Sequence, residues 1–275
     1  MIVPLKNKND SCYIDVALLS LFRSPCPLIR RSIIREQYDC IQDNVCGGSE
    51  SRCHVEELQR EIKRIAIDLS KGKKTNIDCL REKLVNCPKL NETERFDKVG
   101  MNDPSVFIEF LFSLFPCLKE AVEMQKRFQC PDCKEKVQLY THVPPLKYLV
   151  TGPLENIHGT ELSSLINEQK HDFSDVPFII FDLTRVDDRG DFVDDVVVYP
   201  EKKLRLGKSL VWLTSIVVWL DFHYTCYTLI KNEWYHFDDT KKKAFIVGDY
   251  DDLLSCKRGG SPLTNAKWFV YQKKR

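Results

Sequence analysis

Apolar residues repeat with a helical period through the first half of the chain. Segment 13–22, which follows Cys12, is apolar on nearly every side, and this pattern predicts a helix buried in the centre of a domain. Between residues 58 and 69, apolar positions recur every three or four residues with charged residues between them. This spacing predicts an amphipathic helix that ends near Gly72.

Two further helices are predicted before the pattern changes. Residues 77–84 carry the spacing of a short helix. Asp103 is a favoured N-cap residue and Pro104 is favoured at the first helical position, so the pair predicts the start of a strongly apolar helix. That helix continues to Leu114, and Pro116 is expected to end or kink it.

From about residue 135 the chain turns to short runs rich in β-branched and aromatic residues. The predicted strands are 137–141, 176–183, 192–199, 210–220, 224–230, 234–237 and 267–271. Helices that precede strands along a chain are typical of an α+β fold. We therefore expect an antiparallel sheet with a helical lobe packed against one face or side. Segments 46–51, 71–74 and 241–243 are predicted to be exposed connections.

Composition limits the function classes. The chain has 275 residues, 43% of them apolar, and a net charge of +1, as expected of a globular protein with one large domain or two modest ones. A charge so close to zero gives no general attraction to nucleic acid or to an anionic membrane, so neither is expected as a partner. The apolar run 210–220 is far shorter than the roughly 20 residues that cross a bilayer.

The first residues meet charge at Lys6 without the apolar stretch of a secretory signal. We therefore expect an intracellular protein, cytoplasmic or nuclear, whose thiols are reduced. Most of the 12 cysteines have no regular spacing and are expected to be small buried apolar residues.

Cys12 stands apart because it lies in the first turn of a predicted helix. The positive end of the helix dipole and the unpaired backbone N–H groups there favour a thiolate over a thiol. The same N–H groups could hold an oxyanion, so one helix terminus could serve both steps of an acyl transfer. Without a partner, however, such a cysteine is more often part of a core than a nucleophile.

A base for Cys12 is predicted on a late hairpin. Of six histidines, only His223 has a carboxylate at a separation along the chain that a β-hairpin would bring close to the imidazole. A two-residue turn would pair Ile230 with Glu233 and His223 with Thr240, which places Asp238 diagonal to His223 on the same face. A carboxylate there could fix the tautomer and orientation of the imidazole. The alternative is an ordinary edge hairpin with an exposed histidine.

An early cysteine followed by a late histidine and aspartate is the order found in papain-like enzymes. The chain resembles the ubiquitin-specific proteases from nearly end to end. Segment 6–18 (KNKNDSCYIDVAL) resembles the family's cysteine box, and 223–227 (HYTCY) with 234–240 (WYHFDDT) resembles its histidine box. Further similarity is found at Asp103 with Glu109-Phe-Leu, at 176–185 (VPFIIFDLTR) and at 199–201 (YPE).

The resemblance implies a papain-like cysteine protease fold with three parts. These are a helical thumb (1–125), a reduced fingers region (126–175) and an antiparallel β palm (176–275), all in one catalytic domain. It also implies a deubiquitinase, a hydrolase that cleaves the isopeptide or peptide bond after the C-terminal Gly-Gly of ubiquitin or a ubiquitin-like modifier.

Site roles follow from the matched positions. The resemblance implies Cys12 as nucleophile, His223 as general base and then acid, and Asp238 as the group that orients His223, with Asp239 in support. Asn7 matches the position whose amide helps the Cys12 backbone N–H hold the oxyanion. No cofactor is required for this chemistry.

Several positions depart from the family pattern. Asn9 replaces a glycine, and Asn accepts positive φ better than most residues. Asp221 and Phe222 stand where the family has Gly-Gly in a loop that lines the channel for the modifier's tail. Asp15 and Val16 replace Asn-Ser. These differences leave the identity of the modifier open.

Cys130 and Cys133 form a Cys-x-x-Cys pair, which is half of a tetrahedral zinc site. In the family, two such pairs build a zinc ribbon in the fingers, but no second pair follows here. The residues that could complete a structural zinc site are Cys46, Cys53, His54 and Cys117. The alternative is a shortened fingers region held by packing alone.

Two other functions are open at this point. The chain could be an inactive member of the same fold that binds ubiquitin-like proteins or acts as a scaffold. It could also be a zinc-dependent interaction module centred on Cys130 and Cys133, with the Cys12 region purely structural.

Overall fold

The computed structural model describes residues 4–5, 12–23, 33–34, 49–85, 103–115, 159–167, 178–183, 197–206 and 209–273. The main helices of the first half are α1 (Cys12–Phe22), α3 (Ser49–Ser70), α4 (Asp78–Val85) and α6 (Pro104–Leu114). The second half contains β1 (Thr160–Glu161), α8 (Leu162–Asn167), β2 (Phe178–Asp182), β3 (Val198–Tyr199), β4 (Lys203–Leu206), β5 (Ser209–Leu220), β6 (His223–Ile230), β7 (Glu233–Phe237), β8 (Phe245–Gly248), α9 (Tyr250–Ser255) and β9 (Ala266–Lys273). This order confirms the expected α+β class.

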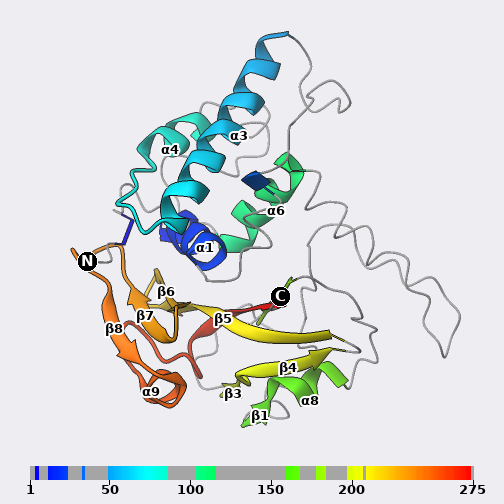
Figure 1. Cartoon of the computed structure of the whole chain (residues 1–275), viewed down its shortest axis with the longest axis vertical. Coiled ribbons are helices and arrows are strands. Elements are labelled where there is room, and N and C mark those ends of the chain that lie inside the picture. The colour runs from blue at the N-terminus through cyan, green and yellow to red at the C-terminus, as the bar shows by residue number, and fades with distance from the viewer. Residues whose placement is uncertain are drawn as a thin grey trace, which may run out of the picture.

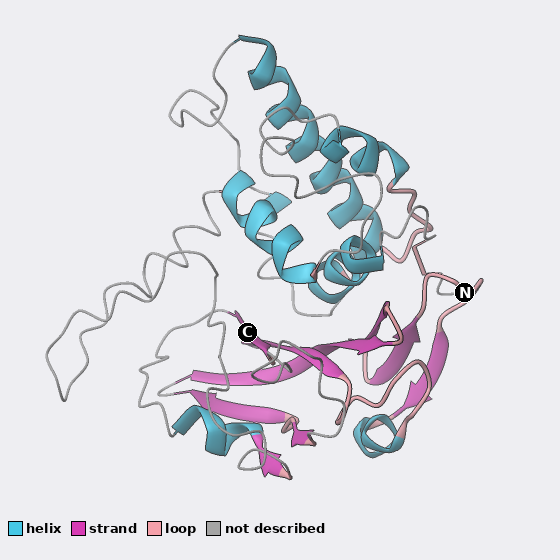
Figure 2. Ribbon diagram, turned by 180° about the vertical axis from the view of Figure 1, so that it is seen from behind, coloured by secondary structure: helices cyan, strands magenta, loops and turns pink. Residues whose placement is uncertain are grey.

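The central sheet has seven strands, and every neighbouring pair in it is antiparallel. Its order is β2–β9–β5–β6–β7–β8, with β4 paired to the beginning of β5. The helical lobe of α1, α3, α4 and α6 lies on one side of the sheet, and α8 and α9 lie on the other (Figures 1 and 2). A separate two-stranded parallel ladder joins β1 to β3.

Side chains of the inner strands alternate between two cores, as the pleat of a strand requires. On β9, Trp268 and Val270 belong to the core shared with the helices, whereas Phe269 and Tyr271 belong to the core on the opposite face. Because both faces are covered, these strands are nearly continuous apolar runs. Among the described residues, no helix is long and apolar enough to cross a membrane.

Helix α1 lies between the sheet and the other helices, and all of its residues are buried. This burial confirms the prediction from its all-round apolar pattern. The carbonyl of Ser20 accepts a hydrogen bond from Ser215 Oγ on β5 at 3.0 Å, which ties the helix to the sheet. The helix also buries Asp15 completely, and Arg81 of α4 lies 2.8 Å from that carboxylate.

Other predicted features are found with small differences. Asp103 Oδ1 accepts from the Ser105 backbone N–H at 2.8 Å, as an N-cap should. Gly72, which has φ 74°, lies just after the end of α3. Segments 71–74 and 241–243 are exposed as predicted. The prediction that 46–51 is a loop was wrong for its last three residues, because α3 begins at Ser49. Serine and glutamate are favoured at the N-terminal end of a helix. The predicted strand 137–141 lies outside the described residues.

A buried lysine joins the sheet to the helical lobe. Lys267 Nζ on β9 lies 2.7 Å from Asp182 on β2 and 3.0 Å from Asp103 at the start of α6. Ser105 Oγ donates to the other oxygen of Asp182 at 2.8 Å. The two carboxylates oppose the effect of burial and raise the pKa of Lys267, so its ammonium is charged.

Replacing Lys267 with methionine is expected to lower the free energy of unfolding by about 3–5 kcal/mol, because Asp182 would remain buried without its cation. Urea denaturation would measure the loss. Lys73→Met is the matched control, since Lys73 is exposed and its ion pair with Asp68 spans 3.9 Å. That control should change stability by less than about 1 kcal/mol. Equal effects of the two substitutions would show that the buried ion pair contributes nothing special.

Candidate active site

The hairpin of β6 and β7 has the predicted register at its turn. Ile230 pairs with Glu233, so the turn has two residues, and the ladder runs back to Cys226 opposite Phe237. The predicted pairing of His223 with Thr240 was wrong. After Phe237 the chain leaves the ladder, because Asp238 Oδ1 accepts hydrogen bonds from the backbone N–H and the hydroxyl of Thr240, at 2.9 and 2.6 Å.

This tight turn brings two carboxylates to His223. His223 Nε2 lies 3.2 Å from Asp238 Oδ1 and 3.4 Å from Asp239 Oδ1. The exposed fraction of the side chain falls from 27% for His223 to 12% for Asp238 and 3% for Asp239. The imidazole therefore reaches solvent on one side while its Nε2 edge faces two progressively more buried acids.

The protonation of Asp238 decides which tautomer His223 adopts. Burial opposes ionisation, but hydrogen bonds from Thr240 and the neighbouring His223 outweigh it and lower the pKa of Asp238 below its ordinary value. An ionised Asp238 can only accept a hydrogen bond, so the neutral imidazole must carry its proton on Nε2. The lone pair is then on Nδ1, the nitrogen that is free to act as a base.

Cys12 is the first residue of α1 and is 2% exposed. Its thiol is within hydrogen-bonding reach of the backbone N–H of Tyr224, which follows His223 at the start of β6. Helix α1 packs on β6. The structure thus places the early cysteine beside the strand that begins with the late histidine.

The thiol of Cys12 is not activated by the helix terminus. Burial raises the pKa of Cys12 to about 11, and the nearby charges of Asp239 and Asp15 add to the effect, although the backbone N–H groups of Tyr224 and Tyr13 oppose it. The expectation that the helix dipole favours a thiolate was therefore wrong for this state, because desolvation outweighs the dipole. At neutral pH the thiol is protonated and needs a base.

A two-residue turn, Asp221-Phe222, connects β5 to β6 directly before His223. Both residues have positive φ, 48° and 61°, a conformation that costs a residue with a bulky side chain about 1–2 kcal/mol. The Phe222 side chain is 77% exposed and touches Trp219 edge to face. An aromatic residue is thus held in an unfavourable backbone conformation at the edge of the site.

Replacing Phe222 with glycine is expected to raise the free energy of unfolding by about 1 kcal/mol, since glycine adopts positive φ without a steric penalty. Thermal and urea denaturation would measure the change. Lys231→Gly is a useful comparison, because Lys231 also has positive φ, 60°, but lies at the other end of β6. If neither glycine variant is more stable, the two turns are not strained.

Three side chains at the site have the spacing of metal ligands. Donor atoms of His223, Asp238 and Asp239 all lie within 4.8 Å of one another. However, Asp238 Oδ1 already faces three donors, the Thr240 backbone N–H, the Thr240 hydroxyl and His223 Nε2. This arrangement fits a hydrogen-bonded histidine better than a metal centre.

Some predicted site residues are not tested by the structure. Asn7 and the cysteine pair Cys130 and Cys133 lie outside the described residues. The oxyanion role of Asn7 and the structural zinc site therefore stay predictions.

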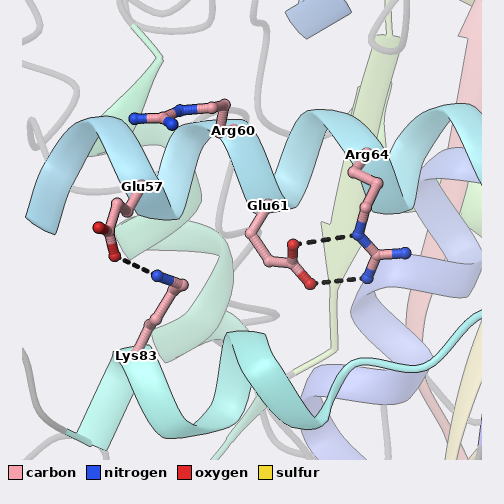
Figure 3. Close-up of a pocket in the computed structure, with 5 residues that line it drawn as sticks. All are labelled: Glu57, Arg60, Glu61, Arg64 and Lys83. Carbon is pink, nitrogen blue, oxygen red and sulfur yellow. Dashed lines mark hydrogen bonds and ion pairs between the residues drawn. The ribbon is translucent and has the colours of Figure 1, made fainter.

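A charged pocket of about 400 Å³ lies between α3 and α4, and it is distinct from the residues around His223. Figure 3 shows that acids and bases in it pair with each other, Glu57 with Lys83 and Glu61 with Arg64. The ion pair between Glu61 and Arg64 spans 2.6 Å. Charges neutralised in this way offer little to a ligand, so the pocket is not the leading candidate.

Asp15 is a site residue that the sequence pattern flagged only as a departure from a family motif. Its side chain is within hydrogen-bonding reach of Asp239 and also accepts hydrogen bonds from Arg81. The available signal was a charged residue within a fully buried helix that is apolar apart from Ser20. The partner that holds it, Arg81, was not predictable from the sequence.

No family model and no curated protein matches the chain. The chain shares its fold with solved structures that superpose on its whole length. An essential yeast splicing factor superposes with a TM-score of 0.55 at 16% identity, and 70% of that chain is covered. A chain of the SAGA Ubp8/Sgf11/Sus1/Sgf73 DUB module bound to ubiquitin aldehyde superposes with a TM-score of 0.53 at 15% identity, again over 70% of that chain. At this identity the similarity establishes the fold alone.

Proposed function

We propose that this protein is a thiol hydrolase that cleaves the bond after the C-terminal Gly-Gly of ubiquitin or a ubiquitin-like modifier, through a thioester to Cys12. One observation carries the proposal: an ionised carboxylate holds His223 through Nε2, and the next residue along the strand contacts the Cys12 thiol. The sequence order of cysteine, histidine and aspartate and the structural likeness to a DUB module support it.

In the first step, His223 Nδ1 accepts the proton of the Cys12 thiol, and the thiolate attacks the carbonyl carbon of the scissile bond. The charge that develops on the carbonyl oxygen is held by the backbone N–H at the start of α1 and, by resemblance, by Asn7. The intermediate collapses to a thioester, and the imidazolium gives its proton to the leaving amine.

In the second step, His223 Nδ1 accepts a proton from water, and the resulting hydroxide attacks the thioester carbonyl. Collapse releases the modifier's free carboxyl group, and the proton returns to the sulfur. Asp238 remains an acceptor for Nε2–H throughout and stabilises the imidazolium in both steps. Each atom that these steps require is supplied by substrate, water or this chain.

The finer architecture is part of the same proposal. The helical lobe corresponds to the thumb (1–125), residues 126–175 to reduced fingers, and the antiparallel sheet to the palm (176–275) of a papain-like cysteine protease. The modifier itself is the least determined part, because Asp221 and Phe222 replace the family's Gly-Gly before His223. The ubiquitin aldehyde named for one structural neighbour makes ubiquitin the first modifier to test.

A panel of ubiquitin, SUMO and other ubiquitin-like proteins that carry a C-terminal electrophile would test the proposal. We expect at least one probe to form a covalent adduct, located at Cys12 by peptide mass spectrometry. The absence of an adduct with every probe, in protein shown to be folded, would remove the enzymatic assignment.

An inactive binding protein of the same fold is the second candidate. Two observations favour it: the Cys12 thiol is buried and protonated, and one structural neighbour is described as a splicing factor. Saturable binding of a ubiquitin-like protein by the unmodified chain, with no adduct and no hydrolysis, would support this candidate over the hydrolase.

A further inference from the structure

Behind the candidate active site, a row of buried charged groups leads from His223 into the helical lobe. Arg81 Nη2 donates to both oxygens of Asp15, at 2.8 and 2.9 Å, and Arg81 Nη1 donates to Asp78 at 3.0 Å. The side chain of Asp15 is also within hydrogen-bonding reach of Asp239, whose Oδ1 is 3.4 Å from His223 Nε2. The row therefore connects helix α4 to the imidazole.

Two carboxyl groups meet in the middle of this row. The side chains of Asp15 and Asp239 are 1% and 3% exposed and are within hydrogen-bonding reach of each other. No nitrogen or hydroxyl among the described residues makes a well-formed hydrogen bond to either oxygen of Asp239. Two ionised carboxylates have no hydrogen to share, so contact between them requires one proton.

We propose that Asp15 and Asp239 share a single proton, and that this acid pair, anchored by Arg81, is a positioning device for His223. The pair then carries one negative charge instead of two beside Arg81, and Asp238 supplies the full carboxylate that holds Nε2. The second part of the inference rests on the proposed function, whereas the shared proton does not.

Electrostatics supports the shared proton. Burial raises the pKa of Asp15 well above its ordinary range, although the charge of Arg81 opposes this effect. The charge of Asp239 and the hydrogen-bonding contact with Asp239 raise the pKa of Asp15 further. Burial likewise raises the pKa of Asp239. Other groups that act on the pair are Cys12 of α1, His223 and Cys226 of β6, and Asp238, and Asp78 of α4 contacts Arg81.

Loss of the shared proton would place a second full negative charge beside Nε2 and near the Cys12 thiol. That charge would stabilise the imidazolium and disfavour the thiolate, because Asp15 and Asp239 already raise the pKa of Cys12. Loss of the shared proton should therefore lower the rate of hydrolysis at alkaline pH.

The shared proton also makes stability depend on pH in a known direction. A carboxyl group whose pKa is higher in the folded than in the unfolded state binds its proton more tightly when folded. Its contribution is full below the unfolded pKa of about 4 and is lost as pH rises toward the folded pKa. Over that window the unfolding equilibrium constant should rise up to tenfold per pH unit.

Asp15→Asn tests the proposal with the smallest change in shape, because the amide nitrogen can donate to Asp239 and the amide oxygen keeps one of the two acceptor positions that Arg81 contacts. Urea denaturation of both proteins from pH 4.5 to 8 gives the ratio of their unfolding constants, in which the contributions of other groups such as His236 cancel. We expect the unmodified protein to lose stability relative to the variant as pH rises. Parallel curves would overturn the shared proton.

Activity is read separately with the ubiquitin-like substrate that the probe panel identifies. At pH 7 the Asp15→Asn variant should keep kcat within about tenfold of the unmodified protein, and its rate should fall less at alkaline pH. Arg81→Met should lower kcat more than KM rises, because the imidazole loses its anchor and not a substrate contact. An unchanged pH–rate profile in Asp15→Asn would overturn the positioning role.

Failure of the proposed function is distinguishable from failure of this inference. If no probe reacts, the hydrolase assignment falls, but the pH dependence of stability still decides whether the proton is shared. If the probes react and the stability curves are parallel, the hydrolase stands and the shared proton does not.

Discussion

Replacing Cys12 with alanine is expected to abolish the covalent adduct with a ubiquitin-like electrophilic probe and to lower turnover by on the order of 10⁶-fold. The sulfur forms the thioester in the first half of the proposed reaction and is its leaving group in the second, so no neighbouring group can substitute for it. Turnover would be followed with a fluorogenic C-terminal conjugate of the reactive modifier. The variant should still bind that modifier, because the rest of the site is unchanged.

Cys79→Ser provides the matched control for thiol accessibility. Cys79 is an exposed free cysteine on α4, whereas Cys12 is buried. If exposure alone determined labelling, Cys79 would react first. The proposal expects the opposite, since Cys12, unlike Cys79, lies beside the strand that begins with His223. An adduct that survives in Cys12→Ala and disappears in Cys79→Ser would mean that the probe reports accessibility and not catalysis.

Loss of activity in Cys12→Ala must also be separated from loss of fold. Cys12 is 2% exposed and belongs to the core that the helices share with the sheet. Removing one buried sulfur costs about 1 kcal/mol, which is small beside the usual stability of a domain. A normal urea transition together with absent turnover would therefore attribute the effect to chemistry.

Local patterns in the sequence were sufficient for the elements that position the site. The all-round apolar segment after Cys12 predicted a central helix, and α1 is buried along its whole length. The runs on either side of Lys231-Asn232 predicted a hairpin with a two-residue turn, and Ile230 does pair with Glu233. Both predictions succeeded because the signals lie within a few residues of the structures they specify.

Other elements were missed because their local signals are weak. β4 (Lys203–Leu206) alternates exposed and buried positions over only four residues. α9 (Tyr250–Ser255) is short, but it has a capping box between Asp249 and Asp252 that a closer reading of that segment could have found. β8 (Phe245–Gly248) is an exposed edge strand that its neighbour β7 supports.

The electrostatics of the site could not be read from the sequence, because it depends on contacts between distant segments. The helix position of Cys12 suggested a thiolate, yet burial raises the pKa of its thiol to about 11. Asp15 is separated by 66 positions from Arg81, and no local pattern links the two. Desolvation and long-range pairing appear only when the chain is folded.

Replacing His223 with alanine is expected to lower turnover at pH 7 by on the order of 10⁶-fold, close to the effect of removing the nucleophile. The reason is the protonated thiol: with a pKa of about 11, Cys12 loses its proton at pH 7 only if a base accepts it. Since base and nucleophile act as one unit, the Cys12→Ala and His223→Ala effects should not add.

The pH profile separates this role from a structural one. Without a base, the rate of His223→Ala should follow the thiolate fraction and rise about tenfold per pH unit toward pH 11. In enzymes with a histidine base, the rate instead stops rising with pH near neutrality, where imidazole loses its proton. The turnover of Asp238→Asn should lie between that of the unmodified protein and that of His223→Ala. We expect a loss of up to about 10⁴-fold, because the imidazole remains but its tautomer is no longer fixed.

His236→Gln is the control for a histidine of the same hairpin outside the proposed machinery. His236 is buried on β7, its ring packs on Tyr227 at 4.8 Å, and burial lowers its pKa to about 4, so it is neutral at pH 7. Its replacement should reduce stability and leave the pH–rate profile unchanged. If His236→Gln steepens the profile and His223→Ala does not, the base has been assigned to the wrong histidine, and Asp238 then orients a residue that takes no proton from Cys12.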